Sequence, residues 1–143
     1  MANTYTSLHY HIVFSTKNRD PFLVETVRER LFAYLGGIAR ENGMNALEVG
    51  GMTDHVHLLL SLPSTVPIAK AVHLLKSGSS KWIHENFPQS PGFSWQQGYG
   101  AFSISISQQE KTVAYIHAQA KPHERVNSAE EFREFLMAHA MLP

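Results

Sequence analysis

The stretch of sequence that most constrains the fold runs from Asp54 to Leu62 and reads DHVHLLLSL. Side chains two residues apart in an extended strand point to the same face, so His55 and His57 should stand side by side. Neutral imidazole suits borderline metals such as zinc, manganese or nickel. Two imidazoles on a rigid strand would therefore anchor an ion and leave positions open for substrate. An isolated His-x-His pair is, however, more often two polar residues on a solvated sheet face.

The length and composition indicate one soluble domain. The 143 residues suit a single unit spanning 1–143. Lysine and arginine number 12 against 12 acidic residues, so any nucleic-acid binding must come from a local patch. The absence of cysteine excludes disulfides and thiolate chemistry. No apolar run approaches the ~20 residues of a membrane span, and the N-terminus lacks a leader pattern. We therefore expect a cytoplasmic protein.

Hydrophobic periodicity predicts four strands and two long helices in the first three quarters of the chain. Apolar side chains recur at every second position in the strands and at every third or fourth position in the helices. Between the second and third strands, Gly50 and Gly51 would permit a tight hairpin. In chain order we predict a strand over 5–15, a helix over 23–42, strands over 44–49 and 54–62, a helix over 68–86 and a strand over 101–107.

Two capping boxes mark the starts of helices in the last quarter of the chain. In residues 107–110, SQQE, the serine would accept hydrogen bonds from free backbone N–H groups and the glutamate would reach back. This pattern predicts a helix over about 108–120. Residues 128–131, SAEE, form the second capping box and predict a C-terminal helix over about 128–140.

The helix predicted over 108–120 has an aromatic residue outside its apolar stripe. Val113 and Ile116 belong to the stripe, whereas Tyr115 and Gln119 project well away from it. The latter two are four residues apart and so share one face. A tyrosine outside a core stripe indicates a reason other than burial for its presence.

The order strand, helix, strand, strand, helix, strand predicts an α+β fold. It is the βαββαβ order of a ferredoxin-like antiparallel sheet with helices on one face, here over a core of about 5–106 with C-terminal helices appended. The first and third strands are usually central neighbours in that topology. His9 and His11 of the first strand would then lie beside the strand that carries His55 and His57, and the uncovered sheet face would be free for a ligand.

Two further features leave alternatives open. Residues 87–100 are rich in Pro, Gly, Ser and Gln and predict a long loop, which in compact domains is often functional. Trp95 and Tyr99 could stack on bases there or anchor the loop on the core. On the helix before the loop, Lys76 and Lys81 flank small hydroxyl residues. They could contact phosphates, although a solvated helix face is the commoner explanation.

Three motifs in order indicate a family. The HUH element at 55–57, the YGAFS stretch at 99–103, and Tyr115 followed by Gln119 closely resemble the single-tyrosine HUH transposases of the insertion-sequence-200-like group. The likeness runs from Tyr5 to about Gln119 and includes the stretch FSTKNR.

This resemblance implies a small transposase that cuts and rejoins single-stranded DNA with hairpins at insertion-element ends. It implies a homodimer that uses a divalent ion, Mg²⁺ or Mn²⁺. By motif match, His55, His57 and Gln119 would be metal ligands and Tyr115 the nucleophile. We also expect a site shared between two subunits, because the helix of Tyr115 has few apolar residues for docking on its own domain.

The chemistry suits these residue types. The phenol of tyrosine has an ordinary pKa of ~10, so the ion must polarise the phosphate and stabilise its developing charge. A phosphotyrosine ester keeps the free energy of the broken bond, and rejoining therefore needs no nucleotide cofactor.

Two alternatives remain at this stage. One is a metal-dependent nuclease or hydrolase in which His9 and His11 complete a four-histidine site and water is the nucleophile. The other is a non-catalytic nucleic-acid-binding ferredoxin-like module that uses aromatic residues of the loop and the first strand for stacking. Both leave the placement of Tyr115 and Gln119 unexplained.

Overall fold

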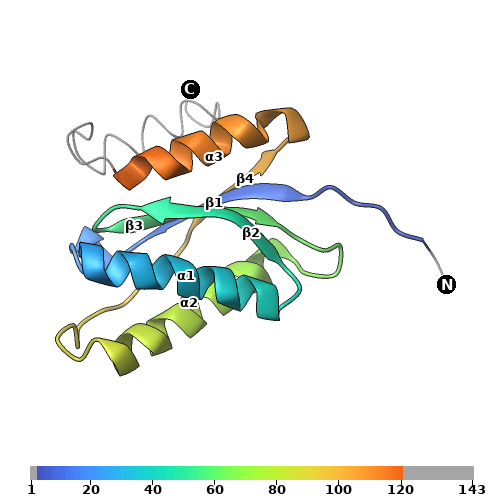
Figure 1. Cartoon of the computed structure of the whole chain (residues 1–143). Helices are drawn as coiled ribbons and strands as arrows, with labels where there is room; N and C mark the ends of the chain where they lie inside the picture. Colours follow the sequence, from blue (N-terminus) through green and yellow to red (C-terminus); the bar gives the residue numbers. More distant parts are fainter. Residues whose placement is uncertain (1–2, 121–143) are drawn as a thin grey trace.

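The computed structural model describes residues 3–120, which form a four-stranded antiparallel sheet with helices on both faces (Figure 1). The strand order is β2-β3-β1-β4, so the first and third strands are the central neighbours, as predicted. The α+β fold and the βαββαβ order are confirmed. The elements are β1 (His9–Ser15), η1 (Lys17–Arg19), α1 (Glu25–Glu41), β2 (Asn45–Gly51), β3 (His55–Ser61), α2 (Ile68–Asn86), β4 (Gly100–Ile104), η2 (Ile106–Gln108), α3 (Gln109–His117) and η3 (Ala118–Ala120).

The main core lies between the sheet and the two long helices, α1 and α2, which cover one face of the sheet (Figure 1). Ile12 and Phe14 enter it from β1, and Val56, Leu58 and Leu60 enter it from β3. All five side chains are buried, and truncating such a leucine to alanine typically costs about 2–5 kcal/mol. This core makes the sheet a rigid support for whatever its other face carries.

The other face of the sheet, which we expected to be uncovered, is covered in part by the appended helix α3 (Figure 1). Ile116 of α3 is fully buried against Leu59 and Ile104 in a second, smaller apolar cluster. The helix approaches β2 closely, because a Cβ added at Gly50 would lie 2.5 Å from the Ile116 carbonyl oxygen. The histidine-bearing face of the sheet is therefore partly covered by α3.

The prediction that Tyr115 and Gln119 project away from the buried side of α3 is wrong. Gln119 is fully buried and Tyr115 is half-buried against the second cluster. Thr112 and Ile116 are the other buried residues of this helix. The helix is rotated from its apolar stripe toward these polar side chains because the sheet face beneath it is itself partly polar.

Several element ends differ from the sequence-based prediction. α3 starts at Gln109 with no side-chain cap, because the Ser107 hydroxyl bonds the Ser105 hydroxyl at 3.0 Å instead of capping the helix. β4 ends at Ile104, and Ile106 beyond it is 69% exposed.

The two glycines predicted to form a hairpin turn belong to β2, and the turn lies after them. The C-terminal helix predicted over 128–140 lies outside the described residues.

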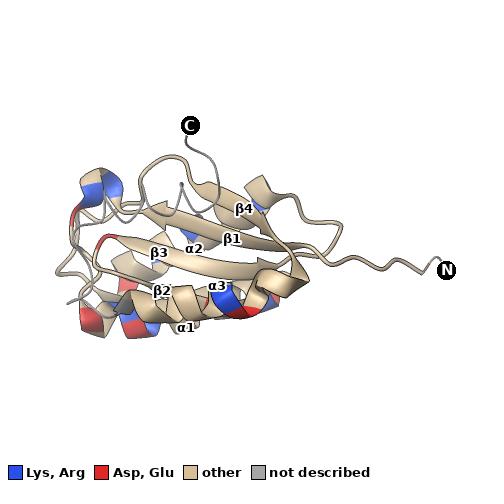
Figure 2. Ribbon diagram, turned by 90° about the horizontal axis from the view of Figure 1, so that it is seen from above, with Lys and Arg blue, Asp and Glu red and all other residues tan. Residues whose placement is uncertain are grey.

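Apart from Glu48 of β2, the charged side chains of the described residues lie on the helices and turns (Figure 2). The four strands contain no lysine or arginine, and Glu48 is their one acidic residue. Positive charge near the sheet therefore has to come from its ends, as at Lys17 and Arg19 of η1. In the part of the chain from 3 to 120, no helix has the length and apolar character required to cross a membrane.

Candidate active site

The two histidines of the HUH element lie side by side on β3, as their spacing predicts. Their ring centroids are 5.0 Å apart. His55 is 5% exposed and His57 is 2% exposed, so neither is the solvated surface residue of the commoner interpretation. Because Val56 and Leu58 fill the main core on the opposite side, the strand fixes both imidazoles on the face that α3 covers.

His55 is oriented by the residue before it. Its Nδ1 lies 2.7 Å from Oδ1 of Asp54. A carboxylate that accepts from Nδ1–H fixes the ring tautomer and turns Nε2 toward a ligand, as in many metal sites. Asp54 is itself held by the residue that follows β1, because its backbone carbonyl accepts hydrogen bonds from the backbone and the hydroxyl of Thr16.

His57 is oriented by a histidine of the neighbouring strand. Nε2 of His11 lies 2.9 Å from Nδ1 of His57, and His11 is 2% exposed. His9 takes no part in this contact, because in the register of β1 and β3 it lies opposite Ser61. Within residues 3–120 no group of three His, Cys, Asp or Glu side chains has the arrangement of a metal site. The four-histidine alternative therefore has no support here.

The ring of Tyr115 reaches the histidines of its own chain. Its centroid lies 5.6 Å from that of His57 and 5.9 Å from that of His11. This placement differs from the expectation that Tyr115 reaches a site of a second subunit. The helix docks on its own sheet through Ile116 and the partly buried Val113 and Tyr115, so its few apolar residues are enough to hold it within one chain.

Gln119 lies one helical turn beyond Tyr115 and is fully buried. Its Nε2 donates to the Tyr115 backbone carbonyl at 3.3 Å, whereas its Oε1 is buried and has no hydrogen-bond partner among residues 3–120. A buried acceptor of this kind is rare in folded proteins and indicates an absent ion or water. Imidazole nitrogens suit borderline divalent ions, and an amide oxygen suits Mn²⁺ or Mg²⁺. The residues present therefore fit a divalent ion.

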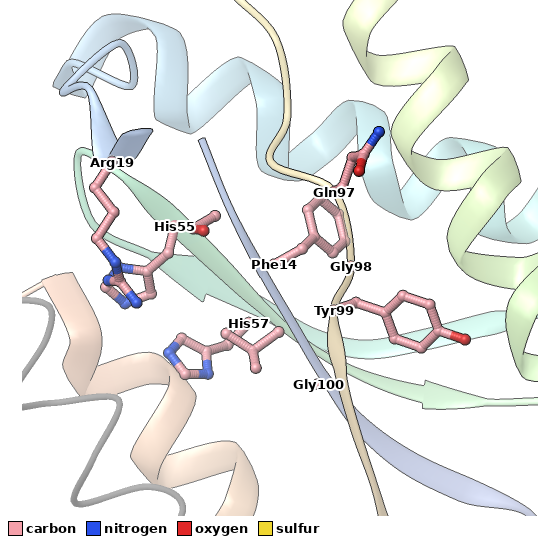
Figure 3. A pocket seen from close by; sticks show the side chains of 10 residues that line it. Phe14, Arg19, His55, His57, Gln97, Gly98, Tyr99 and Gly100 are labelled. Atoms are coloured by element: carbon pink, nitrogen blue, oxygen red, sulfur yellow. The ribbon is translucent and has the colours of Figure 1, made fainter. Parts of the chain in front are cut away.

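A pocket of about 190 Å³ opens beside the histidines (Figure 3). His55 and His57 form one side of it, and Arg19 of η1 lies at the same end. The opposite side is formed by the chain leading into β4. The lining residues are Val13, Phe14, Ser15, Arg19, His55, His57, Gln97, Gly98, Tyr99 and Gly100.

The aromatic residues of the 87–99 loop have different positions. Trp95 anchors the loop, because its Nε1 donates to the Ser79 hydroxyl at 3.0 Å and its ring packs edge-on against Phe14. Tyr99 is 44% exposed and lies at the pocket. The anchoring interpretation therefore holds for Trp95, and only Tyr99 is available for stacking.

Lys76 also holds the loop in place. Its Nζ donates to the carbonyls of Gln96 and Gly98 at 2.7 and 2.6 Å and lies 5.5 Å from the centroid of the Phe14 ring. Burial lowers the pKa of the Lys76 ammonium from its ordinary value of 10.5. The phosphate-contact interpretation of this lysine is therefore replaced by a structural one.

The sequence of nearly the whole described region matches one family of proteins. The family model described as "Transposase IS200 like" matches residues 4–119. The chain belongs to this family. Two curated relatives are the ISDra2 transposase TnpA of Deinococcus radiodurans, 32% identical over 78% of this chain and 84% of that protein, and the IS200 transposase of Salmonella typhimurium, 29% identical over 61% and 57%.

Solved structures of transposases share the fold. A Deinococcus radiodurans structure assigned to a transposase superimposes with a TM-score of 0.68 at 29% identity, covering 83% of this chain and 96% of that one. The REP-associated tyrosine transposase bound to a REP hairpin gives a TM-score of 0.62 at 14% identity, over 86% and 73%. At this lower identity the second likeness speaks for the fold alone. Family membership supports a DNA-processing enzyme.

Proposed function

We propose that this IS200-like transposase cleaves and rejoins single-stranded DNA at insertion-element ends through a covalent phosphotyrosine intermediate. Tyr115 is the nucleophile, and His55, His57 and Gln119 would hold a divalent ion, Mg²⁺ or Mn²⁺. The observation that supports this most is the contact between the rings of Tyr115 and His57, 5.6 Å apart. Half-burial of Tyr115 against the second apolar cluster does not by itself require its ring to meet a buried histidine of the HUH pair.

The residues of the chain provide the positions that transesterification needs. The Tyr115 oxygen bonds to phosphorus while one P–O bond of the DNA breaks, and the phenol proton ends on the released hydroxyl end. The reverse attack by another hydroxyl end rejoins the DNA and restores the tyrosine. A bound divalent ion supplies Lewis acidity that polarises the phosphate. Because α3 is docked on the sheet, Tyr115 is oriented before DNA binds, which lowers the entropic cost of attack.

The DNA partner is proposed to be a single strand with a hairpin. The hairpin-bound REP-associated tyrosine transposase, which has the same fold, supports this class of ligand. The net charge of the present chain is zero, which gives it no general attraction to DNA. Binding therefore relies on local cations such as those of η1. A homodimer is proposed with it, because an element has two ends to be processed.

The test is covalent capture of DNA by the protein. Wild-type protein, incubated with Mn²⁺ and single-stranded oligonucleotides from the element's ends, should give a protein band of higher mass on denaturing electrophoresis. Tyr115→Phe should give none, because only the attacking oxygen is removed from a half-buried ring. Tyr10→Phe is the matched control, since it removes the same atom from β1 on the opposite face of the sheet, and it should form the adduct.

Free DNA ends without an adduct from wild-type protein would instead favour a hydrolase with a water nucleophile. An adduct that persists in Tyr115→Phe would refute the assignment of the nucleophile.

A further inference from the structure

The pocket beside the histidines exists because the chain before β4 separates from β1. Pairing between β1 and β4 extends to Val13 opposite Gly100. Hydrogen bonding to β1 resumes where the backbone of Gln96 donates to the Ser15 carbonyl at 2.8 Å. Residues 97–99 lie between these two points, and the middle one has a left-handed φ of 86°. We call this segment the 97–99 bow. The pocket is the space between the bow and β1 (Figure 3).

The bow is held in place by contacts from other elements. The ammonium of Lys76 binds the carbonyls of Gln96 and Gly98, and the backbone of Asn18 donates to Oε1 of Gln96 at 3.1 Å. The bow is thus bound directly by α2, and the residue before it is bound by η1. A wall fixed in this way is available to a ligand without the entropic cost of ordering a loop.

The pocket lining has the chemistry of a nucleotide site. Arg19 supplies a cation beside His55 (Figure 3), and no carboxylate is among the described residues that line the pocket. Asn18 and Arg19 have φ values of 57° and 55°, a left-handed pair that is uncommon outside glycine and costly to keep. Gly98 has open space where a Cβ would lie, whereas the Tyr99 ring points away from His55 and His57 (Figure 3).

We propose that this pocket binds the base of the nucleotide next to the scissile phosphate, with Arg19 contacting the DNA backbone at its mouth. This inference rests on the proposed function, because it takes the phosphate to be held at His55 and His57, which line the pocket. A nucleotide joined to that phosphate lies directly at the opening. The volume, about 190 Å³, is below the ~300–1,000 Å³ of sites for drug-sized ligands and suits one base.

Ser15 offers a way to fill the pocket. It lies opposite His55 in the register of β1 and β3, so its side chain shares the histidine face and lines the pocket. In Ser15→Leu the added carbons would occupy the space of the base. Ser15→Val is a smaller, strand-compatible second variant. Ser61→Leu is the matched control, because Ser61 lies on the same face of β3 at the opposite end of the strand from His55.

The experiment combines these variants with DNA that lacks one base. Wild-type protein is first reacted with a random-sequence single-stranded library, and sequencing of the captured adducts locates the scissile phosphate. The preferred oligonucleotide is then prepared with one abasic residue at each position around that phosphate. For wild type we expect one abasic position to slow adduct formation by about 5- to 100-fold, as expected from loss of one stacked base.

For Ser15→Leu we expect the order of the two reaction rates, intact against abasic, to be reversed at that position. The intact oligonucleotide should react slowly, and the oligonucleotide abasic at the same position should react faster than the intact one. Ser61→Leu should behave as wild type. Mn²⁺ titration and circular dichroism verify that each variant is folded, and Ser15→Val replaces Ser15→Leu if the latter is not.

An abasic-to-intact rate ratio that is the same in the Ser15 variants and wild type at every position would overturn the base pocket, while adduct formation by wild type would leave the proposed function standing. Wild-type protein that forms no adduct with any library member would refute the proposed function itself.

Discussion

Nε2 of His11 lies 2.9 Å from Nδ1 of His57, and through this contact the central strand β1 orients a candidate metal ligand on β3. For His57 to coordinate through Nε2, its Nδ1 must carry the proton and donate to His11. Asp54 holds Nδ1 of His55 in the same way. Each imidazole of the HUH pair thus has its own orienting partner, one a carboxylate and the other a second imidazole.

The first prediction concerns His11. His11→Ala removes the acceptor for Nδ1 of His57, and we expect Mn²⁺ affinity to fall by about 10- to 100-fold, as is usual when the orienting partner of a ligand is lost. Isothermal titration of the DNA-free protein measures this. His9→Ala is the control, because His9 contacts the Ser7 hydroxyl and not the HUH pair. Equal losses in both variants would mean that His11 has no special role.

The histidine face could be predicted from the sequence, whereas its partners could not. Period-2 alternation placed His55 and His57 together, and the βαββαβ order placed β1 beside β3. That His11 and not His9 contacts His57 depends on the strand register. The register sets His11 opposite Leu59, two residues from His57, and sets His9 opposite Ser61. Register is decided by the packing of whole strands and not by any local pattern.

The orientation of α3 could not be predicted from the sequence either. Its apolar residues are few, and a stripe drawn through Val113 and Ile116 leaves Tyr115 on the outer side. The structure buries Gln119 as well as Ile116, because the surface beneath the helix is itself partly made of histidines. Polar side chains that are buried together at a site do not follow the hydrophobic periodicity of the helix. The sequence pattern therefore gave the wrong buried side for α3.

The second prediction concerns Gln119, whose buried Oε1 accepts no hydrogen bond from the described part of the chain. Gln119→Met keeps the side-chain length and removes the unsatisfied acceptor. A buried acceptor without a partner typically destabilises the folded state by about 1–3 kcal/mol. We expect the metal-free variant to be as stable as wild type or more so in urea unfolding, and we expect its Mn²⁺ affinity to fall. A variant that loses stability and keeps Mn²⁺ affinity would show that Gln119 serves packing alone.

The third prediction concerns the closeness of α3 to the sheet. A Cβ at Gly50 would lie 2.5 Å from the backbone oxygen of Ile116, so Gly50→Ala should push α3 away and carry Tyr115 from His57. We expect adduct formation to fall at least about tenfold, because small misplacements of a reacting group are costly, while far-ultraviolet circular dichroism stays close to wild type.

Gly36→Ala is the matched control for this change. A Cβ at Gly36, in α1, would meet nothing within 4 Å, and an alanine in a helix interior is favoured over glycine by about 0.5–1 kcal/mol. The control should therefore unfold at higher urea and keep wild-type activity. Full activity in Gly50→Ala would show that α3 tolerates displacement.

The last prediction is that each chain builds its own site. Tyr115 meets His57 of the same chain, and η2 joins β4 directly to α3. For Tyr115 to serve a second subunit, Ile116 would have to leave its buried position against Leu59 of its own chain and regain the same contact on the partner. When Tyr115→Phe and His57→Ala proteins are mixed, we therefore expect no recovery of adduct formation.

Differently tagged subunits must be shown by co-purification to form mixed dimers, because only these report on the arrangement. In a shared site, the mixed dimer would combine the intact tyrosine of one chain with the intact histidines of the other. Recovered adduct, carried by the His57→Ala chain that contributes Tyr115, would therefore mean that α3 exchanges between subunits. Absence of adduct in proven mixed dimers, alongside activity when wild type is mixed with Tyr115→Phe, supports a site contained within one chain.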